Sequence, residues 1–496
     1  MNMEIQQEQN MNQETDQEQN KVSNQNQEVN RDPKEKEEAL QISEDLLDFL
    51  QASPTAFQAV DQVRKRLTEA GYRELYEGSD WDLQPNGLYF VLRNESSILA
   101  FRTPADLKHL HGFQIAASHS DSPAFKVKAN PEMTEAGAYT MLNVEKYGGM
   151  LMRPWFDRPL SMAGRLLVED GDNGIRTILV NIDRDLCLIP SLAIHMDREA
   201  NKGHDLNPQK ELLPIFGDEK AKGRLKEILA EEAGVKPDQI LGHDLFLYVR
   251  GRGSIWGEDQ EYVSAGHLDD LQCGFANLKG FIKAGEDDYR NLDDTVPVLA
   301  IFDNEEVGSG TKQGADSTFL SDTLWRIAEA AGLKESDFHR AIANSFMLSC
   351  DNAHAVHPNY SDKADPVNRP LMNHGIVMKY NANQKYTTDG VSAAVFRNLC
   401  RKLDLSLQEF TNRSDMAGGS TLGNISNAHI SLNTVDIGLP QLSMHSPYET
   451  AGVYDTLDLI RLTHTFFQSR FSDLGGGKFR MENEWLKPAY GEICRN

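Results

Sequence analysis

Acidic and histidine side chains gather where apolar, strand-like runs of this sequence end. They follow three such runs within a few residues: His119 and Asp121 after residues 113–117, Glu305 and Glu306 after 298–302, and Asp351 after 345–350. His445 comes a few residues after a fourth run, and Asp269 precedes a helical stretch that begins near Gly274. The carboxyl ends of parallel strands share one edge of a sheet, so we expect these side chains to converge there.

The residue types in this group are those that bind divalent metal ions. Imidazole nitrogen and carboxylate oxygen are the ligands that zinc and similar ions accept where thiolates are absent. Two histidines and three carboxylates suit two ions that share one carboxylate, and such a pair lowers the pKa of a bound water for hydrolysis. Adjacent Glu305 and Glu306 fit a division of labour in which one binds metal and the other is a general base. Asp121 lies two residues from His119 on an extended segment, where its carboxylate would accept the second N–H of the imidazole.

Each of these features also has a simpler interpretation. A histidine at a strand end is more often structural than a ligand, and an Asp before a helix is usually its N-cap. A Glu-Glu pair usually belongs to a solvated helix face. The combination of several such residues at strand ends is what favours a metal site.

The surrounding sequence predicts an α/β fold. Helical periodicity in residues 37–50 and 57–67 is followed by two short runs typical of a hairpin, 87–92 and 97–101. After Gly257, buried-strand candidates alternate with helical stretches. This alternation predicts a mostly parallel central sheet with helices on both faces.

Residues 123–253 have a different texture. Short β-like runs alternate there with polar, Gly- and Pro-containing connections, and one helix candidate spans residues 220–232. We therefore predict an inserted β-rich domain. It would divide a catalytic domain into residues 36–122 and 254–475.

Both ends of the chain differ in composition from the rest. Residues 1–35 are rich in Gln, Asn and Glu, and such a segment buries too little apolar surface to fold, so it is predicted to be disordered. Residues 476–496, which follow Gly475, are predicted to form a loose C-terminal tail.

The overall composition excludes several classes of protein. The chain has 496 residues with 50 Lys and Arg against 75 Asp and Glu, a formal net charge of −25. Such a charge argues against nucleic acid or an anionic membrane surface as the main partner. The five cysteines lie far apart, so neither a disulfide framework nor a thiolate zinc site is expected. No apolar run approaches the roughly 20 residues needed to cross a bilayer, and a signal-peptide pattern is absent. We therefore expect a cytoplasmic enzyme that does not bind a membrane.

Seven sequence blocks, taken together, resemble one family. They occur in the order His119-Ser-Asp121-Ser-Pro123, Trp155-Phe-Asp-Arg158, Ile194-His195, Leu268-Asp269-Asp270, Asp303-Asn-Glu305-Glu306-Val-Gly308, Asp351-Asn-Ala-His354-Ala-Val-His357-Pro-Asn-Tyr360 and Met444-His445-Ser446. With them, the chain resembles the aspartyl aminopeptidase family of co-catalytic zinc metallopeptidases from about residue 38 to about residue 472. The stretches that begin at Asp303 and His354 are the most distinctive.

The resemblance implies a zinc-exopeptidase-like fold and an aminopeptidase that removes N-terminal residues from peptides with two divalent ions. Zn²⁺ is the expected metal, and Co²⁺ or Mn²⁺ suit the same ligands. By motif position, Asp269 would bridge the ions, with His119 and Asp351 completing one site and Glu306 and His445 the other. Glu305 would be the base, with Asp121 behind His119.

The resemblance also implies assembly and substrate contacts. Family members form tetrahedral dodecamers built from dimers, and the inserted domain would be the dimerisation domain. The residues that match substrate-contacting positions are His195, which would reach a neighbouring subunit's site, and Lys379, Tyr386, Gly418, Gly419 and Ser420. One departure is Asp270, which stands where many relatives carry Asn.

The family name implies a preference for N-terminal Asp or Glu, for which Lys379 would be the cationic partner. Three alternatives remain open: a preference for neutral residues such as Leu or Ala, a deacylase or carboxypeptidase with the same metals, and a non-catalytic scaffold. The scaffold is disfavoured because all five proposed ligands and Glu305 are present.

Overall fold

The computed structural model describes residues 31–286 and 294–483. The chain separates into two units, Met1–Glu38 and Ala39–Asn496. The first helix of the described residues, α2 (Pro33–Gln51), begins in the first unit. The prediction of a disordered tail is wrong for residues 33–35, which are helical. The reason is local: the Asp32 carboxylate accepts the N–H of Lys34 and Pro33 opens the helix, two features that start a helix ahead of its apolar stripe. The rest of the predicted tail, residues 1–30, lies outside the described residues.

A mixed sheet of nine strands forms the centre of the described chain, in the order β1-β2-β3-β13-β4-β14-β18-β16-β17. The strands are β1 (Arg73–Leu75), β2 (Leu88–Arg93), β3 (Ser97–Arg102), β13 (Thr295–Phe302), β4 (Gly112–His119), β14 (Phe346–Cys350), β18 (Asn433–Gly438), β16 (Ile376–Lys379) and β17 (Leu407–Phe410). The four central strands β13, β4, β14 and β18 are parallel to one another. Antiparallel pairs occur toward the edges, where β2 pairs with β3, β3 with β13 and β18 with β16. The predicted α/β sheet is confirmed, with these antiparallel additions.

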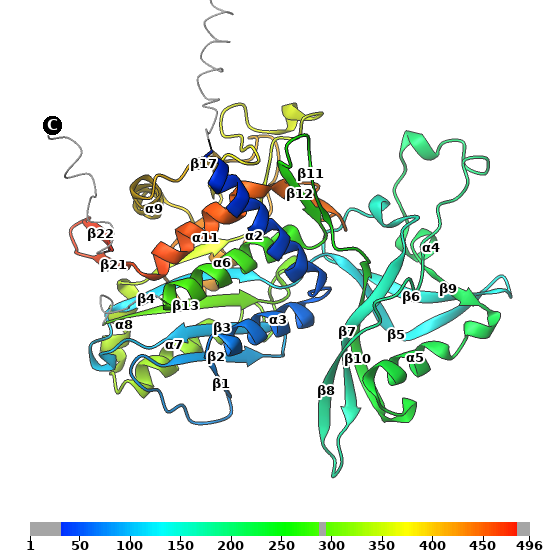
Figure 1. The fold of residues 1–496 in the computed structure, drawn as a ribbon, viewed down its shortest axis with the longest axis horizontal. Coiled ribbons are helices and arrows are strands. Elements are labelled where there is room, and N and C mark those ends of the chain that lie inside the picture. Colours follow the sequence, from blue (N-terminus) through cyan, green and yellow to red (C-terminus); the bar gives the residue numbers. More distant parts are fainter. Residues whose placement is uncertain (1–30, 287–293, 484–496) are drawn as a thin grey trace, which may run out of the picture. The chain divides into compact units, whose positions relative to one another are not determined.

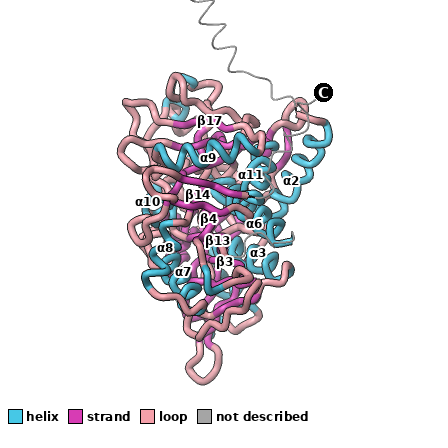
Figure 2. The backbone as a smooth tube through the Cα atoms, turned by 90° about the vertical axis from the view of Figure 1, so that its left-hand side faces the viewer, coloured by secondary structure: helices cyan, strands magenta, loops and turns pink. Residues whose placement is uncertain are grey.

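Helices cover both faces of this sheet, as Figures 1 and 2 show. Besides α2, they are α3 (Ala56–Glu69), α6 (Leu268–Glu286), α9 (Gly390–Lys402) and α11 (Val453–Phe467) on one face, and α7 (Phe319–Ala330), α8 (Glu335–Ala343) and α10 (Leu422–Ser426) on the other. Alternate strand residues divide between the two cores, as the two-residue period of a strand requires. In β3, Ile98 and Ala100 pack with the first set of helices, and Leu99 and Phe101 with the second.

A second sheet lies within the predicted insertion. Its strands have the order β8-β7-β10-β5-β6-β9, with β5 (Ala124–Glu135), β6 (Tyr139–Tyr147), β7 (Leu160–Glu169), β8 (Ile175–Asn181), β9 (Ile215–Asp218) and β10 (Ile240–Val249). It has its own apolar core around Phe125, Trp155 and Leu247. The helix predicted for 220–232 is α5 (Arg224–Ala233), and a shorter helix, α4 (Pro208–Glu211), precedes it.

Two small sheets complete the described chain. One contains β11 (Ser254–Trp256), β12 (Tyr262–Ala265), β20 (Glu449–Gly452), β19 (Pro440–Leu442) and β15 (Ala353–His354), and the other β21 (Arg470–Asp473) and β22 (Phe479–Glu482). The predicted loose tail is therefore wrong up to residue 482, because β22 pairs with β21 and buries Met481. Residues 484–496 lie outside the described residues.

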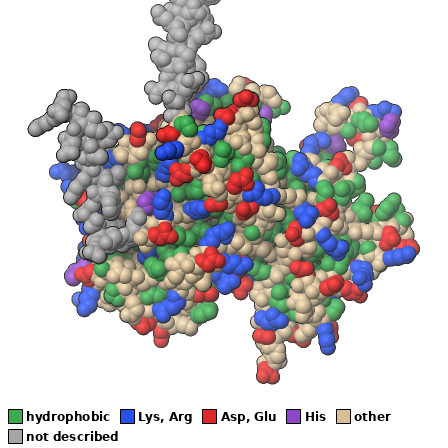
Figure 3. All heavy atoms as spheres, viewed as in Figure 1, with side chains coloured by type: hydrophobic (Ala, Val, Ile, Leu, Met, Phe, Trp, Pro, Cys, Tyr) green, Lys and Arg blue, Asp and Glu red, His purple; other side chains and the backbone are tan. Residues whose placement is uncertain are grey.

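The face of the molecule drawn in Figure 3 carries charges of both signs. On the face drawn in Figure 3, acidic and basic side chains are interspersed, without an extended basic patch among the described residues. Within the described ranges, no helix has the length and hydropathy needed to span a bilayer.

Candidate active site

The strand register brings the predicted residues to one edge of the central sheet. His119 is the last residue of β4 and lies beside the end of β13. Glu305 and Glu306 open the short 3-10 helix η6 (Glu305–Val307) that follows β13, and Asp351 directly follows β14. Asp269 stands at the start of α6, where the peptide bond to Asp270 is cis. The structure thus brings these side chains to the same edge of the sheet, as the sequence predicts.

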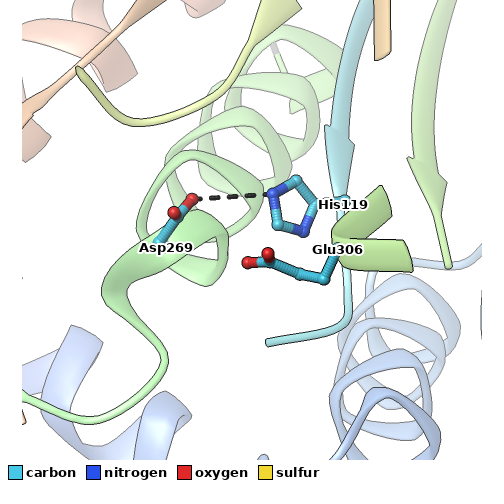
Figure 4. A group of neighbouring side chains, drawn as sticks. All are labelled: His119, Asp269 and Glu306. Atoms are coloured by element: carbon cyan, nitrogen blue, oxygen red, sulfur yellow. Dashed lines mark ion pairs between the residues drawn. The ribbon is translucent and has the colours of Figure 1, made fainter. Parts of the chain in front are cut away.

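The Asp269 carboxylate faces both candidate histidines. Its Oδ1 lies 3.5 Å from Nε2 of His119, and its Oδ2 lies 3.5 Å from Nε2 of His445. Nε2 of His445 is also 3.3 Å from Oε2 of Glu306. In Figure 4, His119, Asp269 and Glu306 point from three separate segments into one space. A carboxylate with one imidazole at each oxygen is arranged as a ligand shared between two ions would be.

Backbone carbonyls orient both imidazoles. Nδ1 of His119 lies 3.0 Å from the carbonyl oxygen of Asp121, and Nδ1 of His445 lies 2.8 Å from that of Gly149. With Nδ1 as the donor to the carbonyl, each ring directs its Nε2 toward Asp269, and Nε2 is the atom that would lose its proton on binding a metal. Such partners commonly fix the tautomer of metal-binding histidines.

The donors in this cluster fit a bound metal. Oδ1 of Asp269 and Oε1 of Glu306 are buried without a hydrogen-bond partner among the described residues, and a buried oxygen without a partner is costly. Ligand atoms of His119, Asp269 and Glu306 lie within 4.8 Å of one another, as do those of Asp269, Asp270 and Asp351. Nitrogen and oxygen donors at such spacing are typical of divalent metal sites.

Asp351 is paired with a buried lysine. The Lys379 ammonium lies 3.3 Å from Oδ2 of Asp351 and donates to the carbonyl oxygens of Asp351 at 2.7 Å and Asn352 at 3.3 Å. Lys379 is 2 % exposed, and although burial lowers its pKa, the charge of Asp351 raises it above its usual range. The ammonium is therefore charged and oriented toward Asp351.

The Asp121 carboxylate has further partners beside the one predicted. The His119 imidazole donates to the Asp121 backbone carbonyl at 3.0 Å, and its Nδ1 also lies 3.4 Å from Oδ1 of the carboxylate, within ion-pair distance. The carboxylate in addition accepts the N–H groups of Glu305 at 3.1 Å and Glu306 at 3.2 Å. Asp121 thus orients the turn that carries both glutamates, because closure of the fold offers its carboxylate two backbone donors.

Glu305 is in the environment of a general base. Burial raises its pKa to about 8, opposed by His119 and reinforced by the charges of Asp351 and Asp121. A carboxyl whose pKa is close to the working pH exchanges protons efficiently.

Sequence reasoning missed Glu449. Its carboxylate accepts the backbone N–H of Asp269 at 3.0 Å and that of His445 at 2.7 Å, and the residue is 2 % exposed. One buried carboxylate therefore holds two proposed ligands from distant segments. The sequence around it, Glu-Thr-Ala-Gly-Val over residues 449–453, has no pattern that would have pointed to it.

The predicted substrate residues do not all lie together. Tyr386 is buried, with the Lys379 ammonium 5.3 Å from its ring centroid. Gly418 accepts a hydrogen bond from Lys385, and Gly419 and Ser420 are exposed in the same loop. His195 is exposed in a loop of the inserted sheet, and no hydrogen bond or ion pair among the described residues joins it to the metal cluster.

The Asp270 carboxylate contacts the cluster through the backbone of His119. Its Oδ2 accepts the backbone N–H of His119 at 3.1 Å, whereas its Oδ1 is buried without a partner in the described chain. Burial raises the pKa of Asp270 well above its ordinary value. The departure noted in the sequence thus adds an acidic group directly beside the proposed ligands.

A cluster of histidine and carboxylate side chains at the carboxyl edge of an α/β sheet is typical of metallohydrolases. The family model for aminopeptidase I zinc metalloproteases (M18) matches residues 49–467. The chain therefore belongs to the M18 family of zinc metalloproteases and is a metal-dependent aminopeptidase. The resemblance to aspartyl aminopeptidases is confirmed at the level of the family.

Curated relatives and solved structures support the same family assignment. A protein of Clostridium acetobutylicum named "Probable M18 family aminopeptidase 2" is 45% identical over 434 residues, which cover 86% of this chain and 99% of the relative. The protein of the same name from Ectopseudomonas mendocina is 41% identical and is covered to 98%, with 86% of this chain. A structure of the Ape4 and Nbr1 complex matches with a TM-score of 0.84 and 37% identity, covering 86% of each chain. The S. cerevisiae mApe1 dodecamer matches with a TM-score of 0.75 and 27% identity, covering 86% of this chain and 96% of that one.

Proposed function

We propose that this aminopeptidase binds two divalent metal ions per subunit and uses Glu305 as its general base. The observation that carries this proposal is the Asp269 carboxylate, whose two oxygens face two different imidazoles at 3.5 Å each. Glu305 stands beside one of the proposed ligands, Glu306, in the same turn.

The donor set divides into two groups around Asp269. His119 and Asp351 would hold one ion, and Glu306 and His445 the other, with Asp269 shared. Zn²⁺ is the expected metal, and Co²⁺ or Mn²⁺ would suit the same nitrogen and oxygen donors. When bound, the ions would supply Lewis-acid activation of water and of the scissile carbonyl.

The chain itself supplies proton transfer and orientation. The Glu305 carboxylate takes the proton of the attacking water and returns it to the leaving amine. Asp121, through the two N–H groups, keeps Glu305 and Glu306 in fixed relative positions. Lys379 and Glu449 hold the elements that carry the remaining ligands.

The proposed substrate is a peptide with N-terminal Asp or Glu, and a neutral N-terminal residue is the second candidate. The Lys379 ammonium forms an ion pair with the proposed ligand Asp351 at 3.3 Å. Because its printed contacts go to Asp351 and Asn352, an acidic substrate side chain would have to share this ammonium with Asp351.

The proposed assembly is a cytoplasmic homo-oligomer, a dodecamer built from dimers. The inserted domain, residues 123–253, would form the dimer contact and bring His195 to a neighbouring subunit's site. The loop around His195 exposes Leu192, Ile194 and Met196, by 61%, 43% and 77%, which suits a loop that packs against another surface. The four cysteines of the described chain are free and buried, as a reducing compartment permits.

The experiment is hydrolysis of one peptide scaffold with N-terminal Asp, Glu, Leu, Ala or Lys, with and without a chelator. Chelator-sensitive release led by Asp or Glu supports the full proposal. Release led by Leu or Ala retains the mechanism and overturns the acidic preference.

Two variants test the proposed roles separately. Glu305→Gln is expected to keep its metal and lose about 10²- to 10⁴-fold in kcat, the usual contribution of a general base. Asp269→Ala is expected to lose metal as well as activity, since both proposed ions would depend on this carboxylate. Activity of Glu305→Gln equal to that of the unmodified chain would overturn the base assignment.

A further inference from the structure

We propose that Tyr147, a residue of the inserted sheet, positions Glu305 and Glu306 by holding the Asp121 carboxylate. This inference rests on the proposed base role of Glu305. It makes the inserted domain part of the catalytic arrangement within its own subunit, in addition to any role in assembly.

The Tyr147 hydroxyl joins two groups that flank the catalytic turn. It donates to Oδ2 of Asp121 at 2.6 Å and accepts from Nδ2 of Asn304 at 2.8 Å. Asn304 immediately precedes Glu305 and has a left-handed backbone, with φ of 62°. A single hydroxyl thus contacts both the residue before the turn and the carboxylate that binds the turn's N–H groups.

The Asp121 carboxylate connects the Tyr147 hydroxyl to the backbone of both glutamates. Its Oδ1 accepts from the Glu305 N–H, and its Oδ2 accepts from the N–H of Glu306 in addition to the Tyr147 hydroxyl. Burial and the charge of Asp121 raise the pKa of Tyr147 above its ordinary value. The phenol is therefore protonated at neutral pH and donates to the Asp121 carboxylate.

The next residues of the inserted domain also lie against the site. Gly148 has φ of 76°, and a side chain at this position would lie 3.2 Å from Cβ of Glu306. The carbonyl of Gly149 orients His445, as described above. The segment that begins at Tyr147 therefore follows the surface of the ligand cluster closely.

Tyr147 packs against another residue of the inserted domain, and it also borders a cavity. Its ring packs edge-on against Phe246 of β10, with centroids 5.4 Å apart. A cavity of about 490 Å³ lies between the inserted and central sheets, and its lining includes Asp121, Tyr147, Asn304 and Phe246. Beside this open volume, the hydroxyl is a discrete link from one sheet to the other rather than part of a continuous packed interface.

Other contacts hold the two sheets together without Tyr147. Gln58 of α3 donates to the carbonyls of Gly164 and Val180 in the inserted sheet, and Arg165 donates to the carbonyl of Asn94. Removing the hydroxyl is therefore expected to leave the fold intact.

The test is Tyr147→Phe in the full-length, metal-loaded enzyme, with Tyr139→Phe as the matched control. Tyr139 stands at the other end of the same strand, β6, and is 49% exposed. We expect Tyr147→Phe to retain its metal and its melting temperature, and to lose about 10- to 100-fold in kcat with KM unchanged, as for other outer partners of metal sites. Tyr139→Phe should match the unmodified enzyme.

Two further measurements separate positioning from a general structural effect. In the Co²⁺-loaded protein, Tyr147→Phe should shift the visible absorption bands through Glu306, whereas Tyr139→Phe should not. In an Asp121→Ala background, Tyr147→Phe should have little further effect on kcat, because its action passes through Asp121. An unchanged kcat and spectrum, a loss explained by lost metal, or a full effect in the Asp121→Ala background would each overturn the inference.

The activities of Glu305→Gln and Tyr147→Phe together distinguish a failure of this inference from a failure of the proposed function. If Glu305→Gln remains fully active, the base assignment itself fails, whatever Tyr147→Phe does. If Glu305→Gln is inactive and Tyr147→Phe is normal, only the positioning role of Tyr147 is lost.

Discussion

The Lys379 ammonium nitrogen lies 2.7 Å from the backbone carbonyl of Asp351 and 3.3 Å from its carboxylate. A surface lysine would be free to meet an acidic substrate, but this one is buried and directed at a proposed metal ligand. Its position therefore links the proposed acidic preference to the proposed metal site.

We expect Lys379→Met to weaken the metal site as well as any acidic preference. The change leaves the buried Asp351 carboxylate without its cation, and breaking a buried ion pair typically costs about 3–5 kcal/mol. Unfolding of the chelated protein should show a loss of about 3 kcal/mol, and metal titration should show weaker binding. Lys402→Met, at an exposed position of α9, is the control. Unchanged stability and metal content, together with a loss of Asp and Glu cleavage, would instead assign the ammonium to the substrate.

We expect Glu449→Gln to reduce metal affinity about 10- to 100-fold, the usual effect of changing an outer partner of a metal site. A carboxylate accepts the N–H groups of both Asp269 and His445, whereas a carboxamide offers one oxygen and turns its NH₂ toward the other donor. Competition with a chelator measures the affinity. Glu329→Gln, at an exposed position of α7, provides the comparison, and equal affinity in the two variants would contradict the role of Glu449.

Metal removal is expected to destabilise the protein more at high pH than at low pH. Burial raises the pKa of Glu305 and of Glu449 to about 8, whereas an unfolded Glu ionises near pH ~4.3. Between these values the folded, metal-free chain binds more protons than the unfolded chain, so its stability falls as pH rises.

His445 acts in the same direction. Burial lowers its pKa, but Asp269 and Glu306 outweigh burial and raise it to about 10, so its stabilising contribution is complete below the unfolded pKa of about 6.5 and is lost as pH rises toward 10. Calorimetry of the chelated protein should therefore give a lower melting temperature at about pH 8 than at about pH 5.5. Addition of Zn²⁺ should raise it most at the higher pH. A melting temperature of the chelated protein that stays level or rises over this range would contradict the raised pKa values of Glu305, Glu449 and His445.

Local sequence was enough to predict the sheet and the residues at its edge. Apolar runs such as 113–117 and 298–302 become the buried strands β4 and β13, because two-sided burial demands continuous apolar segments. Once these strands are parallel, their carboxyl ends share an edge, so His119 and Glu306 must approach one another. For these residues, the apolar pattern of the strands and their order in the chain are enough to predict that the side chains come together.

Tertiary structure alone decided which partners complete the site. Asp121 lies two residues from His119, yet its carboxylate binds the N–H groups of Glu305 and Glu306. Tyr147 reaches the same carboxylate from the inserted sheet, and Glu449 joins two proposed ligands that lie far apart in the chain. Hydrogen bonds of this kind depend on ångström-scale distances and on direction, which are set by the relative placement of whole sheets and loops. Residue type and spacing along the chain contain no information about that placement. They were therefore enough to predict the proposed ligands, whereas the residues that hold these ligands in position could be found only in the folded structure.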